Sequence, residues 1–150
     1  MRQRPARYAK SVSAERGAAL VETAFASVFL ILLVIAIYEF GMVFSTYIAT
    51  INASHVGATY ASMHANPSDE LYERYADLAR HEMRAAHLDM TRVVVAAPQT
   101  PNGNSPGSPI GVTVSYQLQT FTSGMSLPVF GRLGLAPFYL ISWTMWAPIR

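Results

Sequence analysis

The feature that most constrains this chain is a long apolar stretch near its N-terminus that contains almost no charge. Residues 18–44 include only two charged side chains, Glu22 and Glu39, and the sixteen residues between them are uncharged and mostly apolar. At 1.5 Å per residue these sixteen residues span about 24 Å and the whole stretch about 40 Å, whereas the hydrocarbon core of a bilayer is about 30 Å thick. The stretch therefore predicts one transmembrane helix.

Basic residues are concentrated ahead of this stretch. Residues 1–17 contain four arginines and one lysine against a single glutamate, whereas residues 18–150 contain six arginines and eight acidic residues. This asymmetry predicts a cytoplasmic N-terminus, with the rest of the chain beyond the inner membrane. The basic residues of the remaining chain are interleaved with acids, so the sequence offers no basic face for nucleic acid.

Two simpler interpretations of the apolar stretch explain less of it. A cleaved secretory signal has an apolar region of about 7–15 residues that ends at small residues. This stretch is longer, and its far end, I-Y-E-F at 37–40, has no such site. A plain signal anchor is an open alternative, but it does not account for Glu22, because an unpaired carboxylate in an apolar helix costs several kcal/mol.

The residues before Glu22 suggest how its charge is compensated. If a peptidase cut after Gly17, Ala18 would carry a new ammonium group and Glu22 would be the fifth residue of the mature chain. Residues i and i+4 share one face of a helix, so the amine and the carboxylate would be neighbours. In an assembly, the carboxylate could equally neutralise the amine of the next subunit. Either pairing lowers the cost of burying both charges.

These residues together resemble the type III signal of type IV pilins and pseudopilins: a basic leader, Gly17, a small residue after it, Glu22 and an apolar helix. The segment G-A-A-L-V-E-T-A at 17–24, followed by Y-E-F-G at 38–41, is similar more specifically to the TadE-like minor pilins of the Tad (Flp) pilus system. That family typically reads G-A-x-x-V-E-x-A, with an apolar run that ends near E-F-G. Thr23 and Val28 stand where members often have an aromatic residue and a proline.

The resemblance implies a function and a processing site. A prepilin peptidase would remove residues 1–17 between Gly17 and Ala18, and Glu22 would govern processing and assembly. The product would be a minor pilin or pseudopilin, a structural subunit for Tad/Flp (type IVc) pilus biogenesis, adhesion and biofilm formation. Its partners would be major and minor pilins, the prepilin peptidase, the assembly platform and inner-membrane lipid. The alternative is an uncleaved single-pass inner-membrane protein with a periplasmic binding domain.

A continuous helix is predicted over 18–65, because only Gly41 and Gly57 interrupt good helix formers before Pro67. At about 72 Å it would project far beyond the membrane. Glu39 would lie at the outer bilayer edge or, alternatively, carry protons.

After Glu39, small residues recur at every fourth position of the predicted helix, and they allow close approach either by the protein's own sheet or by another molecule. One row contains Ser45, Ala49, Ala53, Gly57 and Ala61; the adjoining row contains Thr46, Thr50, Ser54, Ala58 and Ser62.

The remaining chain predicts a small α+β domain at 45–150. A second short helix is expected from Asn66 and Pro67 to about residue 87, and its apolar face contains Tyr72, Ala76, Ala79, Met83, Ala86 and Met90. Strands expected at 91–97, 110–121 and 138–146 would form a three-stranded antiparallel sheet and complete a pilin-like fold. Residues 122–137 are apolar for a connection: they would cover the sheet edge, form a short helix, or present a surface to a partner.

The sequence shows no catalytic or metal-binding pattern. His81 and His87 are six residues apart, about 240° around a helix, so they cannot chelate one ion together. The chain has no cysteine, which excludes a thiolate zinc site and a cysteine nucleophile. It also lacks a nucleophile-elbow motif and a phosphate-binding glycine loop. We therefore expect no enzyme activity, no cofactor, no metal and no small-molecule substrate.

Overall fold

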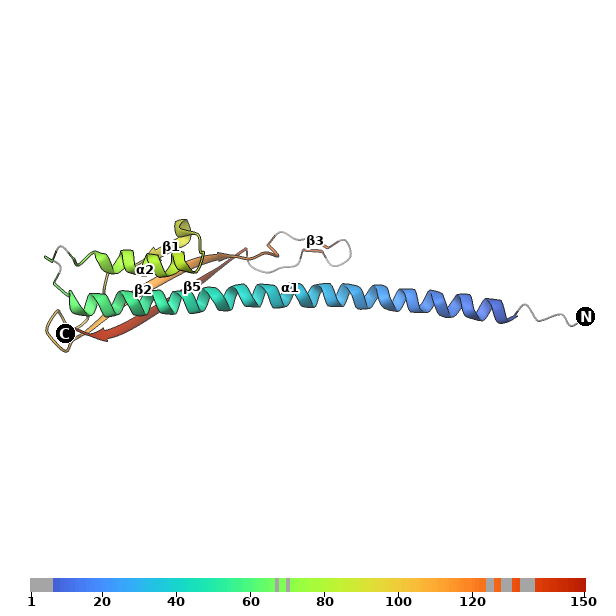
Figure 1. The fold of residues 1–150 in the computed structure, drawn as a ribbon, viewed down its shortest axis with the longest axis horizontal. Helices are drawn as coiled ribbons and strands as arrows, with labels where there is room; N and C mark the ends of the chain where they lie inside the picture. The colour runs from blue at the N-terminus through green and yellow to red at the C-terminus, as the bar shows by residue number, and fades with distance from the viewer. Residues whose placement is uncertain (1–6, 67, 70, 124–125, 128–130, 133–136) are drawn as a thin grey trace, which may run out of the picture. The chain divides into compact units, whose positions relative to one another are not determined.

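The structure, a computed structural model, describes residues 7–66, 68–69, 71–123, 126–127, 131–132 and 137–150. Side chains are described for residues 17–66, 68–69, 71–123 and 137–150. The predicted α+β class is confirmed: a long apolar helix and a short helix precede a three-stranded antiparallel sheet (Figure 1). The elements are α1 (Arg7–Met63), α2 (Arg74–Ala85), the 3₁₀ helix η1 (Met90–Arg92), β1 (Val93–Val95), β2 (Pro109–Gln119), β3 (Ser126–Leu127), β4 (Gly131–Arg132) and β5 (Phe138–Pro148).

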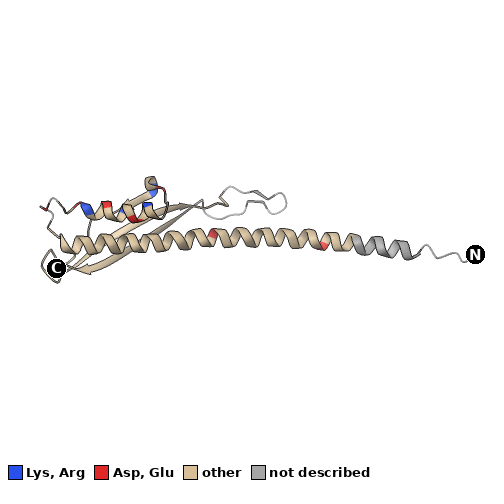
Figure 2. Ribbon diagram, viewed as in Figure 1, with Lys and Arg blue, Asp and Glu red and all other residues tan. Residues whose placement is uncertain are grey.

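The chain divides into two compact units, Met1–Phe40 and Gly41–Arg150. In the first unit, α1 begins at Arg7, earlier than the predicted start at residue 18. Residues 7–16 contain no proline and include arginine, alanine, lysine and glutamate, which favour a helix. Residues 1–6 of the predicted leader lie outside the described residues. Figure 2 shows how sparse charge is along the described part of α1, where Glu22 and Glu39 stand among uncharged residues.

In the second unit, β2 is the central strand of the order β1-β2-β5. It pairs antiparallel with β5 over eleven residues without interruption, from Pro109↔Pro148 to Gln119↔Phe138. The alternation of β2 buries one face of the sheet against the helices and leaves the other face partly open. The buried side chains of that strand are Ile110, Val112, Val114, Tyr116 and Leu118.

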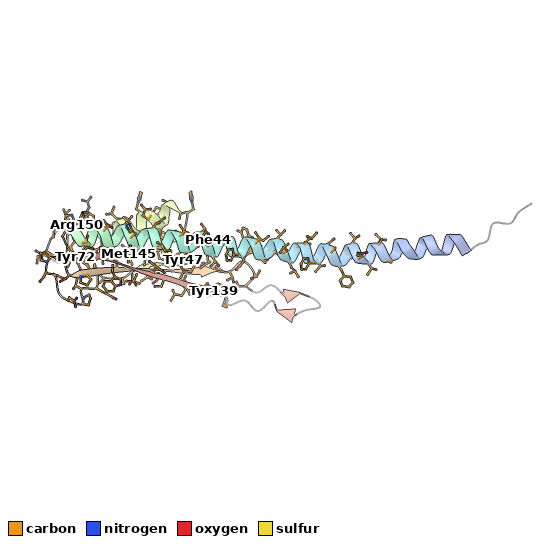
Figure 3. The ribbon with its side chains drawn as sticks, turned by 90° about the horizontal axis from the view of Figure 1, so that it is seen from below. Phe44, Tyr47, Tyr72, Tyr139, Met145 and Arg150 are labelled. Atoms are coloured by element: carbon orange, nitrogen blue, oxygen red, sulfur yellow. The ribbon has the colours of Figure 1, made fainter. Side chains whose placement is uncertain are left out.

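The core of the second unit lies between this sheet, α2 and the last turns of α1 (Figure 3). Ala53, Ala58 and Ala61 of α1 are completely buried, as are Ala79 and Met83 of α2. Small side chains on α1 bring its backbone close to the sheet, and larger side chains from β2 and β5 fill the remaining space. At the edge of the core, the ring of Tyr47 meets that of Trp143 edge to face, with centroids 5.8 Å apart.

The start of α2 differs from the prediction. The helix begins at Arg74, and Asn66 does not cap it: the Asn66 side-chain oxygen accepts from the N–H of Ser68 at 3.0 Å. The carboxylate of Asp69 likewise accepts from the N–H of Leu71 at 3.0 Å. Asn and Asp side chains that bond to the backbone two residues on stabilise turns, so they compete here with the helix. Pro67 and Glu70 lie outside the described residues.

The end of α2 comes two residues before the predicted end at His87. His87 has a left-handed backbone with φ 58°. Its N–H donates to the C=O of Arg84 at 2.9 Å, and the N–H of Leu88 donates to that of Met83 at 3.3 Å. This is the Schellman pattern that terminates helices, with histidine in the place that glycine usually takes. The helix therefore ends before Ala86 and Met90, which were expected to continue its apolar face.

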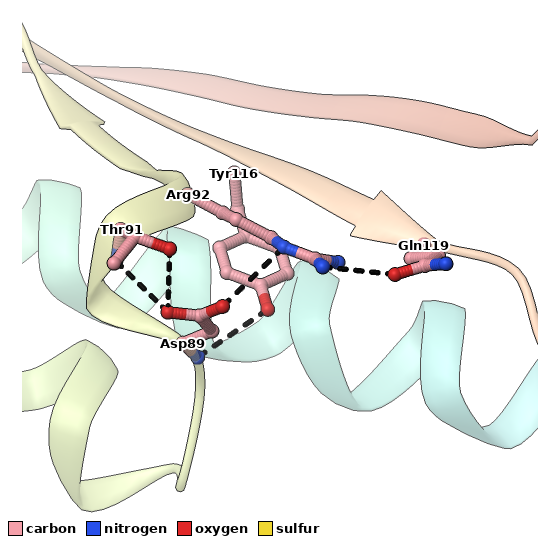
Figure 4. Close-up of polar contacts among 5 residues, drawn as sticks. All are labelled: Asp89, Thr91, Arg92, Tyr116 and Gln119. Atoms are coloured by element: carbon pink, nitrogen blue, oxygen red, sulfur yellow. Dashed lines mark hydrogen bonds and ion pairs between the residues drawn. The ribbon is translucent and has the colours of Figure 1, made fainter.

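The first strand is shorter than the predicted 91–97, because residues 90–92 form η1. Asp89 caps η1: its carboxylate accepts from the N–H of Thr91 at 3.0 Å and from the Thr91 hydroxyl at 2.7 Å (Figure 4). Arg92 lies 3.4 Å from the same carboxylate and donates to the side chain of Gln119 at 2.8 Å. The Tyr116 hydroxyl accepts from the Asp89 N–H at 3.4 Å. This network fixes η1 against β2.

The connection at 122–137 contains a short antiparallel pairing of β3 with β4, Ser126↔Arg132 and Leu127↔Gly131. Its described residues thus form a hairpin-like pair rather than the short helix considered from the sequence. The two other expectations, a cover for the sheet edge and a surface for a partner, fall largely on residues 124–125, 128–130 and 133–136, which lie outside the described residues.

Candidate processing and assembly site

Gly17 and Ala18 are consecutive residues inside α1. A Cβ added at Gly17 would meet nothing within 4 Å. Glycine in a helix interior costs roughly 1 kcal/mol relative to alanine, so Gly17 lowers the helix propensity of this turn. The chain itself therefore leaves Gly17 accessible and places no steric limit on the residue at this position.

Glu22 is exposed one helical turn after Ala18. Ion pairs among the described side chains include His64–Asp69, Arg80–Asp77 and Arg92–Asp89, and Glu22 takes part in none of these. In the uncut chain the nitrogen of Ala18 is a helical amide without charge. Compensation of Glu22 by this nitrogen therefore requires cleavage after Gly17.

The other polar side chains close to Glu22 are satisfied within the helix. The Thr23 hydroxyl donates to the C=O of Ala19 at 2.8 Å, and the Ser27 hydroxyl donates to that of Thr23 at 2.7 Å. Such bonds to the preceding turn hide a hydroxyl from an apolar medium. Glu39, which does make contacts of its own, is only partly exposed. Glu22, by contrast, is exposed and makes no hydrogen bond or ion pair within the described part of the chain.

The surface around Glu22 is apolar. Leu20, Phe25 and Phe29 are 72%, 75% and 66% exposed. Large apolar side chains in such numbers on a surface indicate a site that contacts lipid or another protein. Within Gly17–Met63, α1 is long and apolar enough to cross a membrane, and its most apolar window is not buried by the rest of the chain. This helix is thus suited to a membrane anchor.

In the second half of α1, by contrast, most of the small residues are buried. Ala49, Ala53 and Ala61 are buried inside the unit 41–150, and so is Gly57. A Cβ at Gly57 would lie 3.1 Å from Val112 and 3.5 Å from Ala79, so this glycine allows both the sheet and α2 to approach. The adjoining row, Thr46, Thr50, Ser54, Ala58 and Ser62, is buried as well, whereas Ser45 is exposed. The chain's own sheet and α2 occupy this stripe.

In the described part of the chain, the acidic and histidine side chains do not gather into a metal-binding cluster. Among the described residues, no group of three or more His, Asp or Glu side chains lies close enough to hold a metal ion. His81 is exposed on α2, and His87 is exposed beyond the end of that helix. The most connected histidine is His64, which stacks on Tyr60 at 4.6 Å and lies 3.1 Å from the carboxylate of Asp69. The Leu71 N–H, followed by His64, lowers the pKa of Asp69, so this group closes the turn after α1 as a carboxylate.

One surface feature was not predicted from the sequence. An open hollow of about 310 Å³ lies on the surface between α1 and α2, and its exposed lining is apolar. It is lined by His55, Val56, Thr59, Tyr60, Met63 and Leu78. A signal was present, because Met63 and Leu78 are apolar residues outside the small-residue rows and the predicted apolar face of the second helix, but their proximity depends on how α2 packs on α1.

A comparison with known protein families finds a match that lies within α1. The model of a family described as TadE-like protein matches residues 17–59, less than a third of the chain. No curated protein and no solved structure matches the chain significantly. The family match and the membrane-length helix fit a membrane protein associated with the Tad pilus. Over residues 17–59, which carry Gly17, Glu22 and most of the small-residue stripe, this chain is similar to TadE-like proteins, as its sequence predicts.

Proposed function

We propose that this chain is a minor pilin or pseudopilin that serves the biogenesis of a Tad/Flp pilus. Residues 1–17 are the cytoplasmic leader, residues 18–44 the inner-membrane anchor, and residues 45–150 the domain beyond the membrane. A prepilin peptidase cuts after Gly17, and the mature subunit then meets other pilins and the assembly platform. The role is structural, as in the pilus-associated family that it resembles, and involves no catalysis, cofactor or metal.

The TadE-like match at residues 17–59 carries this proposal. It begins at Gly17 and includes Glu22, the two positions on which a pilin signal depends. The exposed carboxylate among exposed leucine and phenylalanine side chains supports it further. Such a charge is expensive in lipid unless a cation neutralises it, and cleavage at Gly17 supplies one four residues away.

Processing is tested by a matched pair of glycine variants. Gly17 and Gly41 both lie in α1, and a Cβ at either position meets nothing within 4 Å. Gly17→Leu and Gly41→Leu should therefore disturb the chain itself equally little. Intact mass and N-terminal sequencing of the membrane-purified protein should show a start at Ala18 for the wild type and Gly41→Leu, but a start at Met1 for Gly17→Leu. A wild-type chain that begins at Met1 in cells with the peptidase would refute the proposal.

Assembly is tested at Glu22, with Glu39 as the matched control on the same helix. Glu22→Gln removes the charge and keeps the shape, so the anchor should still insert. We expect the variant to enter membranes at wild-type levels and to lose most of its incorporation into sheared fibres or its support of fibre formation. Glu39→Gln should reduce either readout much less. Normal piliation with Glu22→Gln would remove the charge-pairing argument and leave only the anchor.

The uncleaved single-pass protein with a periplasmic binding domain is the competing function. The apolar hollow between α1 and α2 is the feature that favours it. It predicts a chain that keeps residues 1–17 and is indifferent to Gly17→Leu. The processing experiment therefore separates the two functions directly.

A further inference from the structure

The indole of Trp146 lies flat across the central strand of the sheet. Trp146 belongs to β5 and pairs with Gly111 of β2. A Cβ added at Gly111 would lie 2.7 Å from the ring carbons Cε3 and Cζ3 of Trp146 and 2.9 Å from Cδ2. Nearly equal distances to three consecutive ring atoms place this Cβ over the face of the ring, because an approach to the ring edge would bring one atom much closer than its neighbours. One face of the indole therefore rests on Gly111, where only glycine leaves room for it.

The opposite face of this ring points away from the helices. Val112 and Val114 of β2 are buried against α1 and α2, so Gly111 and Thr113 lie on the other, open face of the sheet. Trp146 lies on this open face and is 46% exposed. Because its inner face covers the strand, the exposed part of the ring is its outer face and rim. The sheet thus presents a flat aromatic surface to the outside.

Two pairs of hydroxyls continue this face beyond the indole. Those of Thr113 and Thr144 lie 2.7 Å apart, and those of Ser115 and Ser142 lie 2.9 Å apart. In each pair one hydroxyl donates to the other, so one hydrogen and several lone pairs remain for a molecule outside the sheet. Successive pairs are two residues apart, which is about 7 Å along the strands. The Trp146 ring and these two hydroxyl pairs form one straight row, called the indole–hydroxyl row below.

The indole–hydroxyl row carries no charge. Neither β2 nor β5 contains an acidic or basic residue. Arg92 reaches only the far end of β2, where its side chain donates to Gln119 at 2.8 Å. Nucleic acids and anionic lipids are bound largely through lysine and arginine, and organic cations through cages of several aromatic rings. The row lacks these groups, so its charge complement is a neutral ligand.

The row also lacks the surface that a protein partner or a second copy requires. The core of a protein interface is mainly apolar, and sheets that pack face to face interdigitate apolar side chains. Leu140 is 73% exposed on the same face, but Ser142 and Thr144 separate it from Trp146, and the two apolar residues lie about 20 Å apart along the strand. Apolar side chains placed over the row would bury its hydroxyls without partners, which is unfavourable.

A ligand of this row must combine flat C–H surface with hydroxyl groups at short intervals. A pyranose ring with equatorial hydroxyls presents only C–H groups on each face and hydroxyls around its rim. The electron-rich face of an indole attracts such polarised C–H groups. Rim hydroxyls both donate and accept, as the serine and threonine pairs require. Rings joined by β-1,4 bonds form an extended, flat ribbon, whereas α-1,4 bonds make the chain coil away from a flat surface.

We propose that the open face of the sheet binds a neutral, extended glycan with β-1,4-linked pyranose rings. Trp146 stacks on one ring, and the two hydroxyl pairs bond to the rims of the rings that follow. Gly111 is a positioning residue, because it allows the indole to lie flat. This surface belongs to the unit 41–150 and is separate from Gly17 and Glu22, so it does not rest on the proposed pilin function.

Titration of the full chain with cellohexaose, a soluble chain of β-1,4-linked glucose, tests the proposal. The detergent should have a head group without sugar, because a glycoside detergent would compete. Cellohexaose should shift the NMR signals of the Trp146 indole N–H and of the amides of Ser142 and Thr144. It should leave the indole of Trp143 unchanged, because that ring contacts Tyr47 on the helix side. Maltohexaose, which has the same glucose units in α-1,4 linkage, should bind at least about tenfold more weakly.

Three variants separate the flat position of the ring from its presence and from apolar area. Trp146→Ala should weaken cellohexaose binding at least about tenfold. Gly111→Ala keeps the indole but displaces it, since the added Cβ overlaps the ring, and should weaken binding by a similar factor. Leu140→Ala removes a more exposed apolar side chain from the same face and should change the affinity less than about twofold. Unchanged signals from the buried residues Val112 and Val114 show that a variant is folded, and the comparison of the two sugars on the wild type is decisive on its own.

Three results would overturn the proposal: no shift of the Trp146 signals with cellohexaose, equal affinity for maltohexaose, or undiminished binding by a folded Trp146→Ala chain. Shifts of the Trp146 indole that grow with the concentration of the chain alone would identify a second copy on this face and refute the choice of ligand. None of these readouts depends on cleavage at Gly17, so a failure here is distinguishable from a failure of the pilin proposal.

Discussion

The two parts of α1 have the same helical backbone but opposite patterns of side-chain size and exposure. Residues 17–40 expose large apolar side chains, including Phe25 at 75% and Phe29 at 66%, whereas residues 46–62 bury a stripe of small ones. Large side chains fill an apolar solvent well, and small ones let a sheet and a second helix approach the backbone. The two parts of the helix therefore differ in side-chain size: the exposed residues of the first part are large and apolar, and the buried stripe of the second part is made of small residues.

The contrast predicts that truncating a large side chain matters only in the second part of the molecule. Met83 is completely buried against the core that α1 supports, so Met83→Ala should destabilise the unit 41–150 by about 2–5 kcal/mol. Phe29→Ala removes a larger side chain from an exposed position and should leave the stability of this unit unchanged. Urea unfolding of the full chain in detergent, followed by the fluorescence of Trp143 and Trp146, measures both. Equal losses would show that the two parts of the helix share one core.

Enlarging one glycine in the packed part of α1 and one in open space tests the same difference in packing by adding volume instead of removing it. Gly57→Leu would drive its Cβ to 3.1 Å from Val112, with the rest of the side chain entering a filled core. Overpacking of this kind typically costs about 1–3 kcal/mol. Gly41→Leu enters open space and should gain up to about 1 kcal/mol of helix stability. The same unfolding measurement compares them, and a Gly57→Leu chain as stable as the wild type would mean that the stripe is not closely packed.

The sequence predicts the long helix and the central strand because each shows a regular pattern of apolar residues. The apolar run defines α1, and the strict alternation from Val112 to Leu118 defines the buried face of β2. The fourfold spacing of small residues from Ala49 to Ala61 was visible too, but its partner depends on contacts between residues about fifty positions apart. The sequence alone therefore left open whether the sheet or another molecule covers that stripe.

The predicted ends of α2 were wrong because side chains that bond to the nearby backbone compete with the helix, and the spacing of apolar residues does not reveal this competition. Asn66 seemed to mark a helix start, yet its side chain and that of Asp69 bond to the backbone two residues on and form turns, so α2 begins at Arg74. His87 seemed to continue that helix, but it adopts a left-handed conformation that ends it. The flat position of Trp146 across β2 was equally hidden, because it depends on the register of β2 with β5.

His87 provides a test in which the second unit should gain stability. A residue with a Cβ pays about 1 kcal/mol for a left-handed backbone that glycine adopts freely. His87→Gly should therefore raise the stability of the unit 41–150 by about 0.5–1 kcal/mol, and His87→Ala should not. The urea midpoint measures the gain, and the midpoint for the wild type is the reference. A loss in His87→Gly would imply that the imidazole makes contacts that outweigh the backbone strain.

The smallest effect expected is a dependence on pH that belongs to the second unit alone. The Leu71 N–H and then His64 hold the pKa of Asp69 below its usual 3.8, and the Thr91 hydroxyl and N–H do the same for Asp89. A carboxyl whose pKa is lowered by folding contributes stability that is complete above its unfolded pKa and is lost as the pH falls through the folded value. The urea midpoint should therefore be flat with respect to these two groups above about pH 5 and should fall below pH 4.

The loss of stability at low pH should depend on carboxylates of the second unit, because the pKa values of Asp69 and Asp89 are lowered by bonds made in the folded state. Asp69→Asn and Asp89→Asn should each make the decline below pH 4 shallower, since each removes one group whose pKa depends on folding. Glu22→Gln should leave the curve unchanged, because Glu22 lies among exposed apolar residues of the first unit and takes no part in the ion pairs of the second. If Glu22→Gln altered the decline as much as Asp69→Asn did, the charge of the anchor would be coupled to the folding of the domain. The contrast between the two parts of α1 would then not extend to their charges.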